Sequence, residues 1–173
     1  MAAIGLLLIS AGRLAAGATP PDSPVATDAV EKFVKTQRAK LCGAIDVQAR
    51  ASTIQPVRIG EGSGVYFLVQ PRDNCLCSPT GNCKVWVLFP EGNGFRVLLT
   101  ASRVQNLQVL STVRRGHPDL ALSAHDSATE STHWIYRFDG VRYRKVSCTE
   151  WSYTDRDDPE RVLDRPQISK CSG

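Results

Sequence analysis

Six cysteines constrain the fold of this 173-residue chain more than any other feature. An even number of cysteines in a small chain is typical of an exported domain held together by disulfides. Three of them crowd into one short stretch and three are widely spaced: Cys75, Cys77 and Cys83, then Cys42, Cys148 and Cys171. We therefore predict that all six are oxidised in pairs.

Geometry favours some pairings over others. Cys75 and Cys77 point to the same side of an extended backbone, so one of them should close the loop onto Cys83. The other can reach Cys42 and tie a helix to a sheet, and Cys148 with Cys171 would hold a polar tail. A zinc site is the alternative, but the paired C-x-x-C knuckles of structural zinc sites are missing. A copper site on the Cys-x-Cys pair is a further alternative. We predict no metal site and no cofactor.

The first residues resemble an export signal. Residues 2–11 form a short apolar run, and Ala16-Gly17-Ala18 supplies the small side chains that signal peptidase requires. We predict a signal peptide over 1–18, a flexible proline-rich lead-in over 19–26 and a single β-rich domain over 27–173. No Lys or Arg precedes the apolar run, so a buried N-terminal helix and a misplaced start codon are the alternatives. We expect a periplasmic or secreted protein without a stable membrane span.

One helix and many strands are predicted for the domain. Asp28 with Glu31 forms a capping-box pattern, and apolar residues then recur at helical spacing up to Cys42, with Gly43 as the stop. Apolar runs separated by turn residues predict strands, and Glu91-Gly92-Asn93-Gly94 predicts a hairpin. The expected strands are 65–69, 85–89, 95–99, 104–113, 120–123, 134–138 and 141–148. We predict a mainly β fold (α+β with one N-terminal helix): an antiparallel meander, sandwich or open barrel of about eight strands, stapled by disulfides.

The charge is mildly basic, with a formal net charge of +4. Basic residues alternate with acidic ones along most of the chain, which argues against nucleic acid as a partner. Lys32, Lys35, Arg38 and Lys40 cluster on the expected helix, where we predict a solvated polar face.

A pattern in the second half resembles that of known repeat proteins. Asp119-Leu120-Ala121-Leu122 is followed by Tyr136-Arg137-Phe138-Asp139-Gly140 and Tyr143. This D-L-x-L…Y-R-F-D-G-x-x-Y pattern, about 25 residues long, resembles uncharacterised exported bacterial β proteins and the hairpins of FG-GAP/VCBS-type repeats. The resemblance implies a hairpin packed by aromatic side chains and an extracytoplasmic setting. Calcium binding does not carry over, because the Asp-x-Asp-x-Gly loop is missing.

Catalytic motifs are scarce. His125, Asp126 and Glu130 are the only weak catalytic candidates, and neighbouring residues on a strand point to opposite faces rather than converge as a triad does. The chain contains no G-x-S-x-G, Walker or H-E-x-x-H motif. The sequence therefore favours a protein that is not an enzyme.

Binding to another protein is the leading functional prediction. Rigid loops on a disulfide-held sheet lose little entropy when they bind, so we predict an exported binding module, such as an inhibitor- or immunity-type protein. The alternatives are a cell-envelope polymer hydrolase that uses His125 with Asp126 or Glu130, and a structural envelope protein. Two loops are the candidate contact surfaces: residues 72–84, with Arg72, Asp73, Asn74 and Lys84, and residues 124–133, with His125, Asp126, Ser127 and Glu130.

Overall fold

The computed structural model describes residues 24–43, 53–58, 65–155 and 157–171. The predicted signal peptide and the first part of the lead-in lie outside these residues. Among the helices of the described residues, none has the length and apolar character needed to cross a membrane.

The single helix of the described chain, α1 (Pro24–Cys42), starts earlier than predicted. Residues 24–26, expected in the flexible lead-in, are helical, and Asp28 lies inside the helix instead of capping it. Proline explains the difference: its fixed φ suits the first turn, where its missing N–H removes no helical hydrogen bond. Gly43, with φ of 64°, lies just beyond the end of α1 as predicted.

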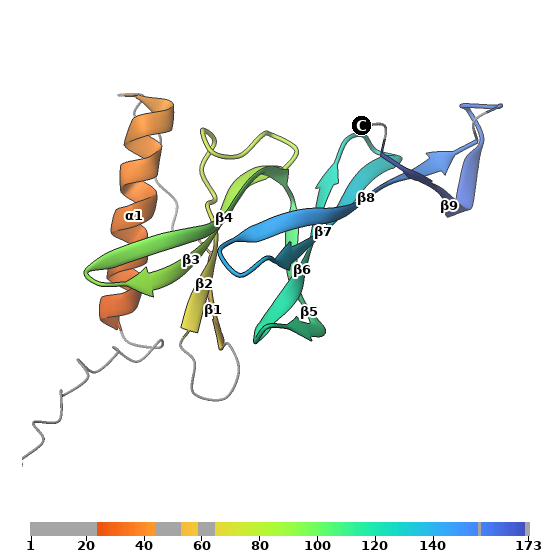
Figure 1. The fold of residues 1–173 in the computed structure, drawn as a ribbon. Coiled ribbons are helices and arrows are strands. Elements are labelled where there is room, and N and C mark those ends of the chain that lie inside the picture. The colour runs from red at the N-terminus through yellow and green to blue at the C-terminus, as the bar shows by residue number, and fades with distance from the viewer. Residues whose placement is uncertain (1–23, 44–52, 59–64, 156, 172–173) are drawn as a thin grey trace, which may run out of the picture.

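Nine strands of the described chain form two antiparallel sheets (Figure 1). Within each sheet the strands follow one another in chain order, so the structure selects the meander from the three arrangements that the sequence left open, with nine described strands where about eight were expected. The first sheet contains β1 (Thr53–Arg58), β2 (Val65–Gln70), β3 (Cys83–Glu91) and β4 (Gly94–Val104). The second contains β5 (Asn106–Arg114), β6 (His117–His125), β7 (Glu130–Phe138), β8 (Tyr143–Thr154) and β9 (Val162–Lys170).

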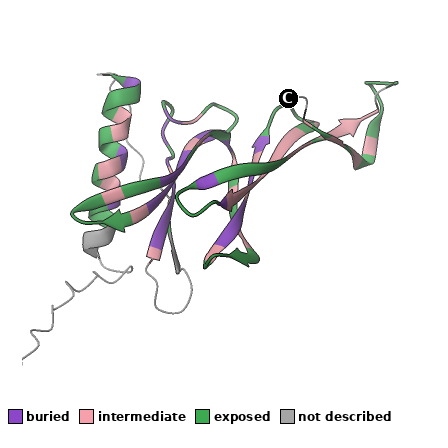
Figure 2. Ribbon diagram, in the orientation of Figure 1, coloured by how far each residue is buried: buried purple, intermediate pink, exposed green. Residues whose placement is uncertain are grey.

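Two hydrophobic clusters make the fold three layers deep, because β3 is buried on both faces (Figure 2). Val85 and Val87 face the cluster between the two sheets, whereas Trp86 and Leu88 face the cluster beneath α1. This explains why β3 reads as a continuous apolar run and not as an alternation. The inter-sheet cluster also contains Tyr66, Leu68, Leu98, Leu99, Val104, Leu120, Leu122, Phe138 and Tyr143.

The three disulfides match the favoured pairings. Cys42 bonds Cys75 and links α1 to the loop after β2, Cys77 bonds Cys83 across that loop, and Cys148 bonds Cys171. The polar tail expected after Cys148 is instead the end of β8 and the whole of β9. We call residues 149–170 the β8–β9 arm. It extends away from the body of the molecule in Figure 1, and none of its described residues is buried.

Candidate functional site

The loop between β2 and β3, the first predicted contact surface, is ordered by a buried carboxylate. Oδ1 of Asp73 accepts the backbone N–H groups of Cys75 (3.1 Å) and Leu76 (2.8 Å). Its Oδ2 accepts Nη2 (2.8 Å) and Nε (3.1 Å) of Arg38 on α1. Arg38 therefore turns inward, away from the predicted solvated face, whereas Lys32, Lys35 and Lys40 are exposed as expected.

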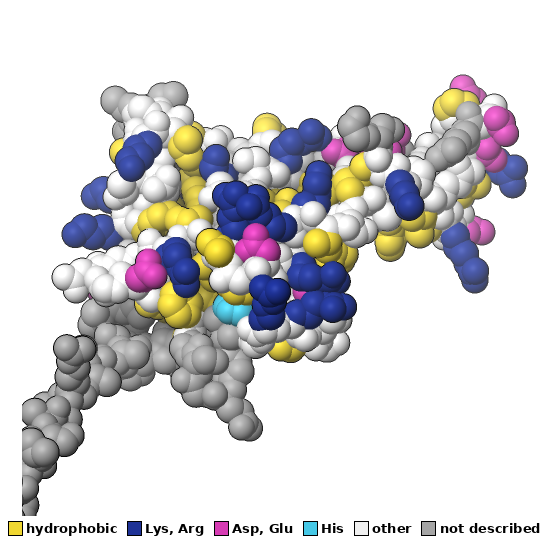
Figure 3. Space-filling view, in the orientation of Figure 1, with side chains coloured by type: hydrophobic (Ala, Val, Ile, Leu, Met, Phe, Trp, Pro, Cys, Tyr) yellow, Lys and Arg dark blue, Asp and Glu magenta, His cyan; other side chains and the backbone are white. Residues whose placement is uncertain are grey.

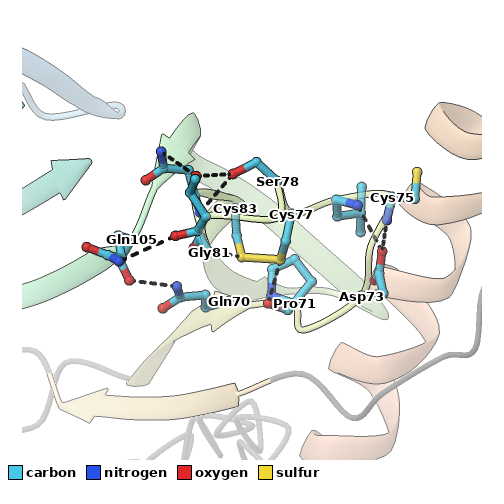
Figure 4. The surroundings of a disulfide bond; sticks show 12 residues. Gln70, Pro71, Asp73, Cys75, Cys77, Ser78, Gly81, Cys83 and Gln105 are labelled. Carbon is cyan, nitrogen blue, oxygen red and sulfur yellow. Dashed lines mark hydrogen bonds between the residues drawn. A yellow bond between two sulfur atoms is a disulfide. The ribbon is translucent and has the colours of Figure 1, made fainter. Parts of the chain in front are cut away.

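Asp73, predicted to be a contact residue, is buried and has a structural role instead. The residue is 1% exposed, so its carboxylate organises the loop and is not available to a partner. Arg72 and Asn74 on either side are exposed, and Lys84 is half-buried on β3. Figure 4 shows the Cys77–Cys83 bond closing this loop.

The two predicted contact loops, far apart in the sequence, lie against each other. The buried Asn82 side chain accepts the backbone N–H of His125 at 3.1 Å and donates to its carbonyl oxygen at 2.5 Å. Gln105, between β4 and β5, fixes the first loop from another side: its carbonyl accepts Gln70 Nε2, its own Nε2 donates to the Thr80 carbonyl (Figure 4), and its backbone N–H donates to the Ser123 carbonyl on β6. The loops therefore form one composite surface.

The second loop, residues 124–133, is also held by its own contacts around its turn at 126–130. The backbone N–H groups of Asp126 and Ser127 both donate to the carbonyl of Glu130, at 3.0 and 3.2 Å. Asp126 Oδ1 pairs with Arg103 at 2.7 Å, and its Oδ2 accepts the Thr132 hydroxyl at 2.5 Å. Arg103 lies in the left-handed region with φ of 61°, an uncommon conformation for a residue that is not glycine. Strained backbone of this kind often occurs at functional sites.

A groove of about 660 Å³ lies beside this loop, on the face of the second sheet that also forms the inter-sheet core. The strand register explains why the groove and the inter-sheet core lie on the same face of the second sheet. Ala124 pairs with Thr132, Thr132 with Glu150 and Glu150 with Ser169, and directly paired residues share a face. Ala124 is buried, whereas the rest of this row lies in the groove. The groove is lined by Arg103, Asp126, Glu130, Ser131, Thr132, Glu150, Trp151, Ser152, Thr154, Asp155, Pro159, Gln167 and Ser169.

Carboxylates dominate this groove, which we call the acidic groove. It contains four carboxylates and one guanidinium, that of Arg103. Asp126 pairs with Arg103, and Asp155 pairs with Arg161 at 3.6 Å. Within the described part of the chain, Glu130 and Glu150 form no ion pair. The groove therefore has an excess of negative charge that a cationic ligand can neutralise.

The weak catalytic candidates are only partly brought together. Asp126 and Glu130 line the acidic groove, whereas His125 does not, and its Nδ1 lies 3.2 Å from the Ser127 carbonyl. No hydrogen bond between described residues joins the imidazole to either carboxylate. No group of three His, Cys, Asp or Glu side chains in the described residues is placed to hold a metal ion.

Sequence patterns missed several groove residues. Glu150, Ser152 and Thr154 alternate along β8 with their polar side chains on one face, and this alternation was the available signal. No sequence pattern indicated that Arg103 lines the groove. Its ion pair with Asp126 depends on how the turn between β4 and β5 packs against the loop after β6.

Comparison with known proteins adds no functional information. No family model, curated protein or solved structure matches the chain.

Proposed function

We propose that this chain is an exported binding module, of the inhibitor or immunity type, that holds a basic segment of another protein in its acidic groove. One observation carries the proposal: the second contact loop, which Asn82 fixes to the first, borders a groove whose carboxylates outnumber its cations four to one.

Rigidity supports binding. The Cys77–Cys83 bond closes the first loop, the Cys42–Cys75 bond anchors it to α1, and Asn82 joins it to the second loop. A surface that is already fixed loses little conformational entropy when a partner docks, so more of the contact energy remains as affinity.

Charge identifies the class of partner. Glu130 and Glu150 lie on the same face of β7 and β8 without a cation of this chain beside them in the described structure. A groove lined by one sign of charge concentrates its field and attracts ligands of opposite sign. Lysine or arginine side chains on an exposed segment of a partner protein provide such a ligand.

The β8–β9 arm supports the same conclusion. It forms one wall of the acidic groove but has no buried residue in its described part, so it adds little to the core. The Cys148–Cys171 bond ties the base of the arm together, so the arm presents its exposed side chains to a partner from a restrained position.

The cysteines support the compartment that the proposal assumes. All six are oxidised in three disulfides, which fits an oxidising environment outside the cytoplasm. Export to the periplasm or the medium is part of the proposal.

A capture experiment tests the proposal. The immobilised full chain is incubated with the extracytoplasmic fraction of its source, beside Glu130→Gln/Glu150→Gln and a control, Asp28→Asn/Glu91→Gln. The control removes two exposed carboxylates outside the groove. We expect a protein with a basic surface segment to bind the wild type and the control and to be lost from the groove variant. Capture of no protein, or equal capture by all three, contradicts the proposal.

One observation favours a second candidate, a cell-envelope polymer hydrolase. Glu130 pairs with Ser152 and Glu150 with Thr132, so the two glutamates are diagonal neighbours on one face. Diagonal positions lie about 7–8 Å apart at the backbone. From that spacing two glutamate side chains can place their carboxyl groups at the roughly 6.5–9.5 Å separation of inverting glycosidases. Release of reducing ends from purified envelope polysaccharide, abolished in Glu130→Gln, would support this candidate over binding. Absence of release removes it.

A further inference from the structure

The outer edge of β4 is available for pairing. β4 is the last strand of the first sheet and is bonded to β3 alone in the described chain. A free edge presents unpaired N–H and C=O groups, and proteins usually protect such edges with charges, prolines or bulges. The edge strands β1 and β9 contain Pro56 and Pro166, whereas residues 97–101 in the middle of β4 have neither proline nor charge.

Arg96 and Arg103 flank the middle of β4, and within residues 97–101 the protective feature is a bulge in the ladder with β3. Val87 pairs with Leu99 and Leu88 with Val97, so Leu98 is the extra residue. Both Leu98 and Leu99 are buried in the inter-sheet core, while Val97 is 40% exposed. The side chains of the bulge are therefore anchored inward.

A groove of about 370 Å³ runs beside this edge. One wall is the β4 segment 97–100, and the other is formed by Tyr136 on β7 and residues 142–145 at the start of β8. We call it the edge groove. It shares no lining residue with the acidic groove. The β4 edge is therefore set in a cleft between the two sheets.

The far wall of the edge groove is basic. Arg142, Arg144 and Lys145 are all exposed there, and Figure 3 shows Lys and Arg side chains gathered over the middle of the molecule, where β4 and β8 meet. Asp139 pairs with Arg144 at 3.0 Å. In the described structure no carboxylate forms an ion pair with Arg142 or Lys145. The groove thus combines a strand-pairing edge with two uncompensated cations.

We propose that an extended acidic segment of a partner protein adds to the free edge of β4 as a further strand, with its carboxylates facing Arg142, Arg144 and Lys145. Main-chain hydrogen bonds then supply affinity and the cations supply selectivity, as in other cases of strand addition. A second copy of this chain is the less suitable occupant. Edge-to-edge pairing of two β4 strands would bring the same cations together, and like charges across an interface are costly.

Peptide probes test strand addition. A labelled, end-capped peptide of about eight residues that alternates Glu and Val has the length of an ordinary strand. It is compared by fluorescence polarisation with a Lys/Val peptide and with the Glu/Val peptide N-methylated at its central residues. We expect binding of the first peptide only, because lysines are repelled and N-methylation removes the backbone donors. Failure of the Glu/Val peptide to bind, or equal binding of its N-methylated form, overturns the proposal.

Charge reversal identifies the groove. Arg142→Glu/Lys145→Glu should weaken binding of the Glu/Val peptide about tenfold or more. Lys32→Glu/Lys35→Glu, on the exposed face of α1, makes the same change in net charge and should leave affinity nearly unchanged. Circular dichroism confirms that each variant folds. If both variants weaken peptide binding equally, only the overall charge of the protein matters. If the wild type self-associates and the groove variant does not, the edge of β4 pairs with a second copy of this chain. Either outcome overturns the proposal.

The acidic-groove variant separates this inference from the proposed function. Glu130→Gln/Glu150→Gln should bind the Glu/Val peptide as the wild type does, because the two grooves share no residue. Loss of peptide binding in that variant contradicts an independent edge site.

Discussion

The ion pair between Arg38 and Asp73 ties the disulfide-rich loop to α1, and its removal should destabilise the domain. The Asp73 side chain is 0% exposed and the Arg38 side chain 16%. Two guanidinium nitrogens reach one carboxylate oxygen, and two backbone N–H groups reach the other. Replacing Arg38 with Met keeps the apolar stem but leaves a buried carboxylate without its cation.

The size of the expected loss in stability depends on which partners the Asp73 carboxylate keeps. Removing one partner of a buried ion pair costs about 3–5 kcal/mol. Asp73 keeps two backbone donors in Arg38→Met, so we expect the lower end, about 3 kcal/mol. Adding Asp73→Asn removes the unpaired charge and should restore about 1–2 kcal/mol of that loss. The double variant should therefore be more stable than Arg38→Met alone.

Urea unfolding with the disulfides intact, followed by circular dichroism, measures these differences. A loss of about 3 kcal/mol lowers the midpoint by about 1–3 M urea. Lys35→Met, on the exposed face of the same helix, is the control and should change stability by less than about 0.5 kcal/mol. The single variant Asp73→Asn completes the comparison. The reasoning fails if Arg38→Met lowers the free energy of unfolding no more than Lys35→Met does. It also fails if the loss in the double variant equals the sum of the losses in Arg38→Met and Asp73→Asn.

Three further predictions concern the loops, the partly buried His117 and the arm. Asn82→Ala leaves the backbone groups of His125 without their partner, and should cost about 1–3 kcal/mol in urea unfolding and speed hydrogen exchange in residues 126–130. Burial lowers the pKa of His117, so below its ordinary value of 6.5 the unfolded chain takes up a proton that the folded chain does not. Stability should therefore fall as the pH is lowered from about 7 to about 5, and less steeply in His117→Phe; equal slopes would contradict this. Cys148→Ser/Cys171→Ser should speed hydrogen exchange in β9 but leave the protection of β3 unchanged; a loss of protection in β3 would show that the arm is part of the core.

The strands that the sequence did not predict have a common physical feature. β1 contains Pro56 and β9 contains Pro166, and a proline inside a short run argues against a strand because it cannot donate to the ladder. Both strands are at sheet edges, where one side of the strand needs no donors. Strands in the middle of a sheet, such as β3, were predicted because burial on both faces requires a continuous apolar run.

The candidate site was predictable in parts and not as an assembly. Sequence patterns identified both loops, and geometry limited the partners of Cys42 and Cys83 to Cys75 and Cys77 without choosing between them; the structure pairs Cys42 with Cys75 and Cys83 with Cys77. The contact of Asn82 with the backbone at His125 depends on how two separate meanders pack, which no local pattern encodes. Asp73 was misjudged for a related reason: a charged residue is expected in solvent unless its buried partner is known, and that partner lies on another element.

Both grooves arise from one mismatch between the sheets. The first sheet has four strands and the second five, and the β8–β9 end of the second sheet projects beyond the first (Figure 1). Beyond it, the inner face of the longer sheet changes from apolar at Ala124 to acidic at Glu150, while the free edge of β4 lies opposite the cations of β8. Ordering a residue costs about 1–2 kcal/mol of conformational entropy, and the β8–β9 arm buries no residue in its described part to offset it. The proposed partners would each use one side of this mismatch: a basic segment the carboxylates of the acidic groove, and an acidic strand the cations of the edge groove.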